Sequence, residues 1–128
     1  MKYKLLTIIC FVALSTSCQT TSKDSTVKLI DNEELKTLLK NDNIQFVDVR
    51  TEAEFSENYI KGAQNIVYNS SFEQKLDQLD KEKPVAVYCR SGRRSAASAE
   101  ILEQHGFKEI YNLDGGILKW MKEGNLVE

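Results

Sequence analysis

The amino-acid sequence predicts an α/β fold in which a central, mostly parallel sheet of about five strands carries helices on both faces. From residue 27 onward, β-rich runs alternate with helix-type segments over short connections, as in strand–helix–strand units. The 128 residues are 41% hydrophobic and 28% charged, which is typical of one globular domain. A net charge of −2 provides no basic excess for nucleic-acid binding.

The elements of the first half are predicted from residue type and capping signals. Residues 27–30 form a short strand, and Asp31 caps the next helix with Glu34 three residues later, as in a capping box. Leu35, Leu38 and Leu39 give this helix an apolar stripe. The remaining expected elements are a buried strand over 44–49, a short helix over 52–58, a short strand over 65–68, and a helix capped by Ser70 or Ser71 that carries Phe72, Leu76 and Leu79.

In the second half, Pro84 precedes the strongest central-strand candidate, residues 85–88. The remaining expected elements are a loop from Cys89 to Arg94, a helix over 95–105 ended by Gly106, a short strand over 108–111, and a final helix after Gly115 and Gly116 that bears Ile117, Trp120 and Met121. His105 is the only histidine and falls at a helix end, where a structural role or solvent exposure is expected. A Cys–His dyad of the protease type is therefore not predicted.

The N-terminus has the layout of a secretory signal peptide over residues 1–17. Two lysines precede an apolar run that is too short to span a bilayer, and small residues follow it up to Cys18. This resembles a bacterial lipoprotein signal with Cys18 as the lipidated residue, although Ser15 stands where a large aliphatic residue is usual. The alternative is ordinary cleavage nearby with Cys18 incidental. We expect an exported cell-envelope or periplasmic protein, with a polar tether over 18–26 and a domain over 27–128.

Cys89 is the candidate nucleophile. Of three cysteines, Cys10 lies in the signal peptide and Cys18 at its edge, so Cys89 alone belongs to the predicted domain. Exported proteins normally pair cysteines in disulfides, so a lone thiol suggests a function, and an inert buried cysteine is the alternative. Residues 89–95 read C-R-S-G-R-R-S between a strand and a helix, where main-chain N–H groups can form an anion nest that lowers the thiol pKa. The candidate loop comprises Cys89, Arg90, Ser91, Gly92, Arg93 and Arg94, supported by Ser95.

Three segments carry a resemblance to single-domain rhodaneses, which are thiosulfate sulfurtransferases. They are D-V-R-T-E-A-E-F at 48–55 with I-K-G-A-Q-N-I at 60–66, V-Y-C-R-S-G-R-R-S at 87–95, and N-L-D-G-G-I-L-K-W at 112–120. The similarity spans roughly residues 28–126. Tyr59 stands where the family usually has a histidine with a mainly structural role.

The resemblance implies that the Cys89 thiolate attacks the outer sulfur of thiosulfate, that sulfite leaves, and that the Cys89 persulfide passes its sulfur to cyanide or a thiol. Arg94 is the arginine expected to close the loop and contact the donor, whereas Arg90 and Arg93 could be a solvated basic rim. Asp48 and Arg50 are expected to brace the loop by ion pairing, although Arg50 could instead contact substrate. No metal or organic cofactor is expected, because no His/Cys cluster could bind one.

Loop length separates this chemistry from related ones. Phosphatases and arsenate reductases of similar fold resemble C-x5-R, whereas here Arg94 is the fifth residue after Cys89 and Ser95 the sixth. Mercaptopyruvate sulfurtransferases resemble a loop with glycine after the cysteine and few charges, so three arginines favour an inorganic dianion. The open alternative is a persulfide carrier or binding module that delivers sulfur to a protein partner with little thiosulfate turnover.

Overall fold

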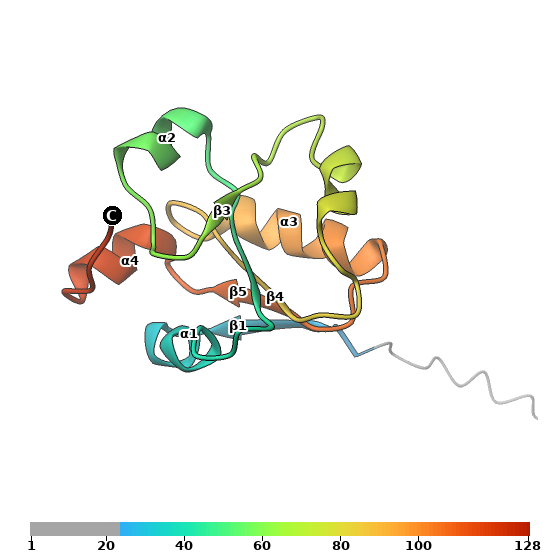
Figure 1. Ribbon diagram of the computed structural model, residues 1–128, viewed down its shortest axis with the longest axis horizontal. Helices are drawn as coiled ribbons and strands as arrows, with labels where there is room; N and C mark the ends of the chain where they lie inside the picture. The colour runs from blue at the N-terminus through green and yellow to red at the C-terminus, as the bar shows by residue number, and fades with distance from the viewer. Residues whose placement is uncertain (1–23) are drawn as a thin grey trace, which may run out of the picture.

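Five parallel strands form the centre of the molecule, in the order β1-β5-β4-β2-β3. Their bounds are β1 Val27–Ile30, β2 Gln45–Asp48, β3 Gln64–Asn65, β4 Val85–Tyr88 and β5 Ile110–Leu113. The structure, a computed structural model, describes residues 24–128 (Figure 1). The predicted signal peptide, Cys18 and most of the tether lie outside the described residues. The expected parallel α/β sheet is confirmed.

Helices cover both faces of this sheet, as predicted. They are α1 Asn32–Leu38, α2 Glu52–Glu57, the 3-10 helix η1 Glu73–Gln78, α3 Arg93–Gln104 and α4 Gly116–Lys122. Side chains of η1 and α3 pack on one face, and side chains of α1 and α4 pack on the other. None of the helices in residues 24–128 has the length and apolar character that crossing a bilayer requires.

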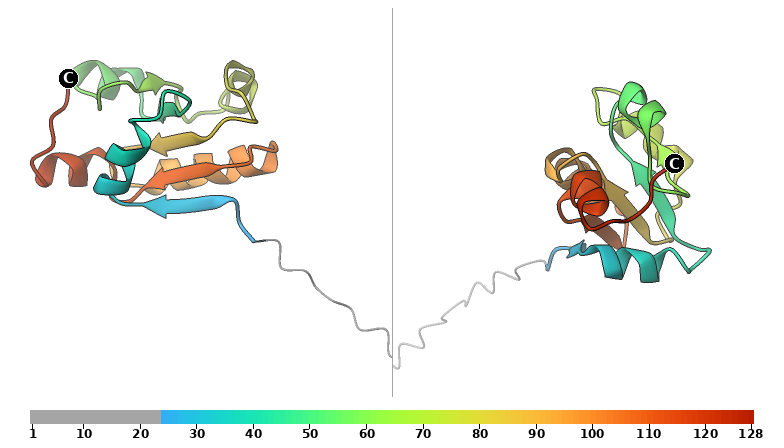
Figure 2. Two further views of the ribbon diagram at one scale, coloured as in Figure 1. Left: turned by 60° about the horizontal axis from the view of Figure 1, so that its bottom comes forward. Right: turned by 90° about the vertical axis from the view of Figure 1, so that its left-hand side faces the viewer.

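Side chains along β4 alternate between the two halves of the core, and this alternation determines which face of the sheet the next residue, Cys89, packs on. Val85 and Val87 face α3, whereas Ala86 and Tyr88 face α1 and α4. Cys89 continues the series on the α3 side. Because β4 lies between β5 and β2 in the middle of the sheet, the segment after it emerges at the centre of the carboxyl edge (Figure 2).

Two capping boxes define how the chain enters its first two α-helices. The Asp31 side chain accepts from the backbone N–H of Glu34, and the Glu34 carboxylate accepts from the N–H of Asp31, as the sequence predicts. Thr51 and Glu54 form the same arrangement at the start of α2. Each box satisfies backbone donors that a helix leaves unpaired at its N-terminus.

Several predicted boundaries are wrong. The strand expected over 65–68 is the shorter β3, and the last strand ends two residues later than expected, at Leu113. Helix α3 begins at Arg93, inside the expected loop, and ends at Gln104. The helix expected after Ser70 or Ser71 is a 3-10 turn without a side-chain cap, in which Asn69 instead accepts from the N–H of Ser71. Its apolar residues are nevertheless buried, as expected: Phe72, Leu76 and Leu79.

Candidate active site

The candidate nucleophile lies at the bottom of a tight loop between β4 and α3. Cys89 directly follows the buried strand, and Gly92 directly precedes the helix. Gly92 has a φ of 107°, a backbone conformation that favours glycine, and this allows the loop to turn back over the sulfur. The loop backbone therefore curls around Cys89, as the sequence predicts.

Main-chain N–H groups converge on the Cys89 sulfur. The N–H of Gly92 donates to Sγ at 3.1 Å. Burial raises the pKa of the thiol, but hydrogen bonds from the Ser95 hydroxyl and from the backbone N–H groups of Ser95, Gly92 and Ser91 outweigh burial and lower it. The Ser95 hydroxyl also donates to the Gly92 carbonyl at 3.1 Å. Because its single proton cannot serve both acceptors at once, the backbone N–H groups are the permanent part of this stabilisation.

The thiol is almost fully enclosed, since Cys89 is only 1% exposed. It belongs to the apolar cluster on the α3 side of the sheet, yet its sulfur faces amide donors rather than only carbon. The sequence predicts the donors but not this depth. So little exposed surface favours a small or slender reagent.

Helix α4 supports the loop from behind, a role that sequence analysis did not assign. The backbone N–H of Ile117 donates to the Cys89 carbonyl at 2.9 Å, and the N–H of Leu118 donates to the Arg90 carbonyl at 3.2 Å. Gly116 packs against the same carbonyl groups, and a Cβ atom there would lie 2.4 Å from the Cys89 oxygen and 2.5 Å from the Arg90 oxygen. The Gly-Gly pair was visible in the sequence, but its contact with the loop was not.

Arg94 is held by Glu54, a second residue whose role sequence analysis missed. The Nη1 and Nη2 atoms of Arg94 donate to the two carboxylate oxygens of Glu54 at 2.7 and 2.8 Å. The pKa of Glu54 is lowered to about 2, first by these hydrogen bonds and then by bonds from Thr51, against partial burial that raises it. The guanidinium of Arg94 therefore pairs with α2 instead of closing the loop, and its expected contact with a sulfur donor stays a prediction.

The other two loop arginines point outward. Arg90 and Arg93 are both exposed, whereas Arg94 is partly buried. The position of Arg90 is fixed at its backbone by α4, which leaves its side chain at the rim. The loop thus presents two exposed cations around an enclosed thiol, an arrangement that attracts anions to the opening.

Asp48 and Arg50 form the predicted ion pair, and both are buried. The Arg50 Nη2 atom lies 2.7 Å from Asp48 Oδ2, and the backbone N–H of Arg50 donates to Asp48 Oδ1 at 2.8 Å. Arg50 also donates to the Asn58 carbonyl at 2.6 Å, at the end of α2. None of these bonds reaches the loop over 89–94, so the pair braces β2 and α2, the helix that carries Glu54, rather than the loop itself as expected. Arg50 is 3% exposed, which disfavours direct contact with substrate.

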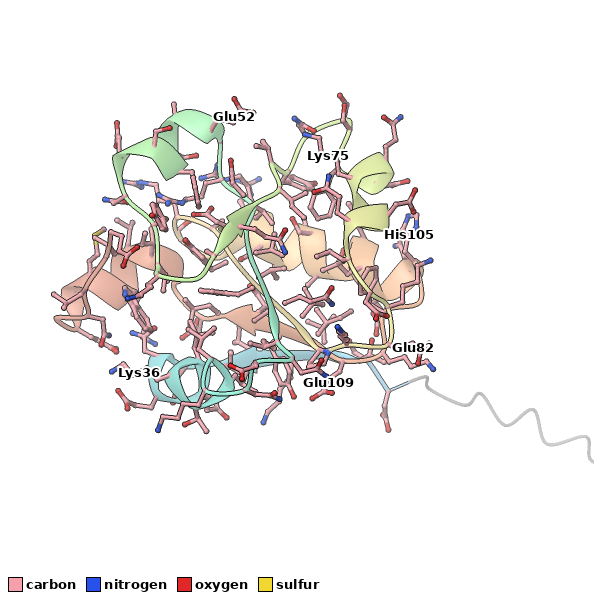
Figure 3. All side chains as sticks on the ribbon, in the orientation of Figure 1. Lys36, Glu52, Lys75, Glu82, His105 and Glu109 are labelled. Atoms are coloured by element: carbon pink, nitrogen blue, oxygen red, sulfur yellow. The ribbon has the colours of Figure 1, made fainter. Side chains whose placement is uncertain are left out.

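Tyr59 and His105 have structural contacts. The Tyr59 ring stacks on Phe55 with centroids 4.5 Å apart, and its backbone exchanges two hydrogen bonds with Glu128. His105 directly follows α3, and its Nε2 atom lies 3.5 Å from the Glu73 carboxylate, at the periphery shown in Figure 3. The structural role expected for His105 fits this position.

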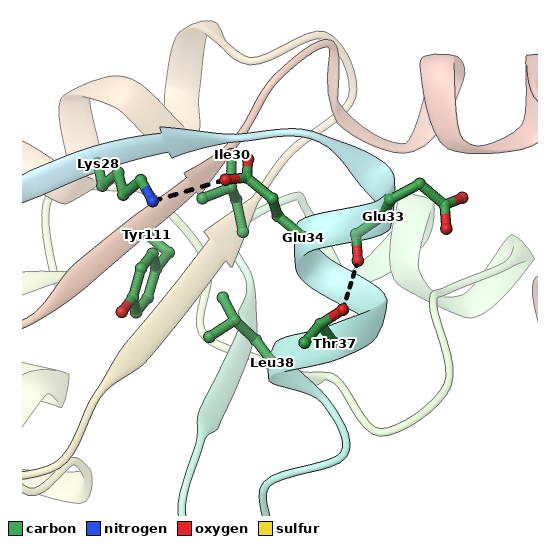
Figure 4. Close-up of a pocket in the computed structure, with 7 residues that line it drawn as sticks. All are labelled: Lys28, Ile30, Glu33, Glu34, Thr37, Leu38 and Tyr111. Atoms are coloured by element: carbon green, nitrogen blue, oxygen red, sulfur yellow. Dashed lines mark hydrogen bonds and ion pairs between the residues drawn. The ribbon is translucent and has the colours of Figure 1, made fainter.

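A pocket lined by residues of β1, α1 and β5 lies away from Cys89, on the α1 side of the sheet (Figure 4). Its volume is about 360 Å³, and none of its lining residues belongs to the loop over 89–95. Within residues 24–128, no three His, Cys, Asp or Glu side chains come together in a group that could hold a metal ion.

Comparisons with known proteins identify a family and several relatives of this chain. The rhodanese-like domain family matches residues 31–123. The chain is 37% identical over 93 residues to the thiosulfate sulfurtransferase GlpE of Coxiella burnetii, covering 73% of this chain and 86% of that protein. It is 33% identical over 99 residues to a sulfurtransferase of Allochromatium vinosum, covering 77% and 92%.

Solved structures agree with the fold. A rhodanese-related protein from Thermoplasma volcanium superposes with a TM-score of 0.70 at 33% identity, covering 79% of this chain and 97% of that one. A further match is to a sequence relative and not to a structure. The uncharacterized protein YqhL of Bacillus subtilis is 42% identical over 76 residues, and the match covers 59% of this chain and 60% of YqhL.

Proposed function

Because the chain belongs to the rhodanese-like domain family, we propose that it is a thiosulfate sulfurtransferase that carries sulfur as a persulfide on Cys89. The observation that carries the proposal is the enclosed Cys89 sulfur with the Gly92 N–H at 3.1 Å and a lowered pKa. A thiolate is the reactive form of cysteine, and these donors increase the fraction of Cys89 that is ionised at a given pH.

In the first half-reaction, the Cys89 thiolate attacks the outer sulfur of thiosulfate. A bond forms between Cys89 Sγ and that sulfur, the sulfur–sulfur bond of thiosulfate breaks, and its electron pair leaves with sulfite. The exposed side chains of Arg90 and Arg93 attract the dianion to the opening. The loop N–H groups stabilise the negative charge that moves onto the bound sulfur.

In the second half-reaction, cyanide or a thiolate attacks the terminal sulfur of the persulfide. The persulfide bond breaks, and its electron pair returns to Cys89 as the thiolate. Thiocyanate or a new persulfide leaves, and no proton has to be added or removed at Cys89. The tight enclosure of the sulfur supports this scheme, because only one added sulfur atom has to be accommodated.

Loop size argues against phosphoryl transfer at the same site. Phosphate needs several oxygen atoms cradled around the nucleophile, but the cup over Cys89 is closed by Gly92 and backed by Gly116. We therefore favour an added sulfur atom over a phosphoryl group as the covalent intermediate.

The test is steady-state thiocyanate formation from thiosulfate and cyanide, with mercaptopyruvate and an aryl phosphate assayed in parallel. We expect turnover with thiosulfate, a mass increase of one sulfur atom on the Cys89 peptide, and loss of both in Cys89→Ala with the fold intact. Turnover of Cys89→Ala near the wild-type rate would refute the nucleophile. A persulfide that forms but leaves only to a protein acceptor would favour the carrier function instead.

We also propose that the protein is exported and anchored to a membrane of the bacterial cell envelope through a lipid on Cys18. The support is the sequence of the first 18 residues, which precede the described domain. Cys18→Ala should release the protein from the membrane fraction. Unchanged membrane association of that variant would count against an acyl anchor.

A further inference from the structure

Glu54 joins two parts of the site that are 40 residues apart in the chain. It lies in the first turn of α2, where its Oε2 atom accepts from the backbone N–H and hydroxyl of Thr51, both at 3.0 Å. The same carboxylate holds Arg94 with both of its oxygens. The capping box of α2 therefore fixes the carboxylate, and the carboxylate fixes the guanidinium of α3.

This pairing has an electrostatic consequence for the thiol. The pKa of Arg94 is raised, first by its hydrogen bonds with Glu54 and also by the negative charge that Cys89 can carry. Arg94 lies two residues after Gly92, whose N–H contacts the Cys89 sulfur, so its positive charge belongs to the same loop-helix junction as the thiol and can attract an anionic donor. Glu54 is ionised at neutral pH and cancels much of that positive charge, and both side chains are only about a third exposed or less.

We propose that Glu54 is a positioning residue of the sulfur-transfer site that orients Arg94 and, as its fixed counter-ion, limits the preference of the site for doubly charged sulfur donors. The substrate part of this inference rests on the proposed function. It assigns to Glu54 a role in choosing between donors by charge. The exposed Arg90 and Arg93 supply the initial attraction, and the Glu54–Arg94 pair sets the charge that the donor meets next to the sulfur.

The variant that tests this role is Glu54→Gln. Glutamine keeps the length of the side chain and one carbonyl oxygen, so it can still accept from Thr51 and from one nitrogen of Arg94, but it has no negative charge. Glu52→Gln is the matched control. Glu52 lies two residues earlier in the same helix and is exposed, at the top of Figure 3, so the change in net charge is the same.

Comparing two sulfur donors of different charge distinguishes an electrostatic role of Glu54 from a purely structural one. Thiosulfate is a dianion, and methanethiosulfonate is a monoanion that transfers the same type of sulfur and releases a sulfinate. Because the interaction energy scales with donor charge, Glu54→Gln should lower KM by about tenfold for the dianion and about threefold for the monoanion at low salt. We expect kcat to change by less than about twofold, because Cys89 and its N–H donors are untouched.

A measurement without turnover keeps this inference separate from the proposed function. The full chain is alkylated with iodoacetate or with neutral iodoacetamide, and modification is followed at the Cys89 peptide by mass spectrometry. Glu54→Gln should raise the ratio of the iodoacetate rate to the iodoacetamide rate by about threefold or more. Glu52→Gln should leave both this ratio and the donor KM values unchanged.

The possible results differ clearly. If the wild type transfers sulfur from neither donor but the alkylation ratio rises as expected, the proposed function fails and the role of Glu54 stands. If Glu54→Gln matches Glu52→Gln in both measurements, the inference is overturned. It is also overturned if KM rises equally for both donors with an unchanged alkylation ratio, because Glu54 would then serve only as the cap of α2.

Discussion

Replacing Gly116 by alanine should disrupt the site although residue 116 never touches a substrate. The added Cβ would lie 2.4 Å from the Cys89 oxygen and 2.5 Å from the Arg90 oxygen. Both atoms belong to the backbone, so no side chain can rotate to relieve the contact. The φ of Gly116 is also +57°, which is unfavourable for any residue with a Cβ atom.

The expected loss of stability in Gly116→Ala follows from the steric clash and from the unfavourable φ. A left-handed backbone conformation costs an alanine roughly 1–2 kcal/mol, and overpacking against a fixed neighbour costs about 1–3 kcal/mol. Real Cβ atoms essentially never approach other atoms closer than 3.0 Å. The loop must therefore move by roughly 0.6 Å, in a setting where misplacement by ~1 Å can lower a rate ~10²-fold.

Gly124→Ala provides the matched control. Gly124 has a φ of +82°, but a Cβ atom there would meet nothing within 4 Å. It therefore has the backbone cost of about 1–2 kcal/mol without the clash. The assays are urea unfolding and kcat/KM for thiosulfate. We expect Gly116→Ala to lose more stability than Gly124→Ala and to lower kcat/KM by about tenfold or more. Equal stability losses with unchanged kcat/KM in both variants would refute the reasoning.

Three further predictions concern charged groups. Asp48→Ala should destabilise the fold by about 3–5 kcal/mol in urea unfolding, because it leaves the guanidinium of Arg50 buried without its partner; a loss below ~1 kcal/mol would contradict this. Arg94→Ala should raise KM for thiosulfate or lower kcat by about tenfold or more, since a charge-assisted contact contributes ~1.5–3 kcal/mol, and normal kinetics would remove Arg94 from the donor site. The lowered pKa of Glu54, about 2, adds stability that is complete above its ordinary 4.5 and is lost as pH falls toward 2. The stability gap between wild type and Glu54→Gln should therefore narrow across that pH range, and a constant gap would argue against the ion pair.

Local sequence signals predicted much of the fold. The capping box at Asp31 and Glu34 involves residues three apart, so residue type alone reveals it. The buried strand before Cys89 is recognisable because all of its residues are apolar or aromatic. The loop around the thiol follows from the same kind of information, since Gly92 and the start of α3 are adjacent to Cys89 in the chain.

Contacts between distant segments were not predictable in this way. Glu54 reads in the sequence as an ordinary first-turn helix residue, and only the fold places its carboxylate against Arg94. Gly116 likewise reads as a helix start, although its lack of a side chain is required by a carbonyl group in another loop. Asn112 favours turns by residue type, which is why the last strand was ended too early. In the structure it pairs with Leu29 and Val87 inside the sheet.

The Ile117 and Leu118 contacts with the loop also determine when the reactive thiol can appear during synthesis. Translation delivers Cys89 well before these residues, and chains generally fold from their N-terminal part first. Until α4 has formed, whether at the ribosome or after export, the carbonyl groups of Cys89 and Arg90 lack the two N–H donors that hold the loop in place. A chain at that stage therefore has the cysteine without a finished cup around it, and the proposed nucleophile gains its full set of loop contacts only once the domain is nearly complete.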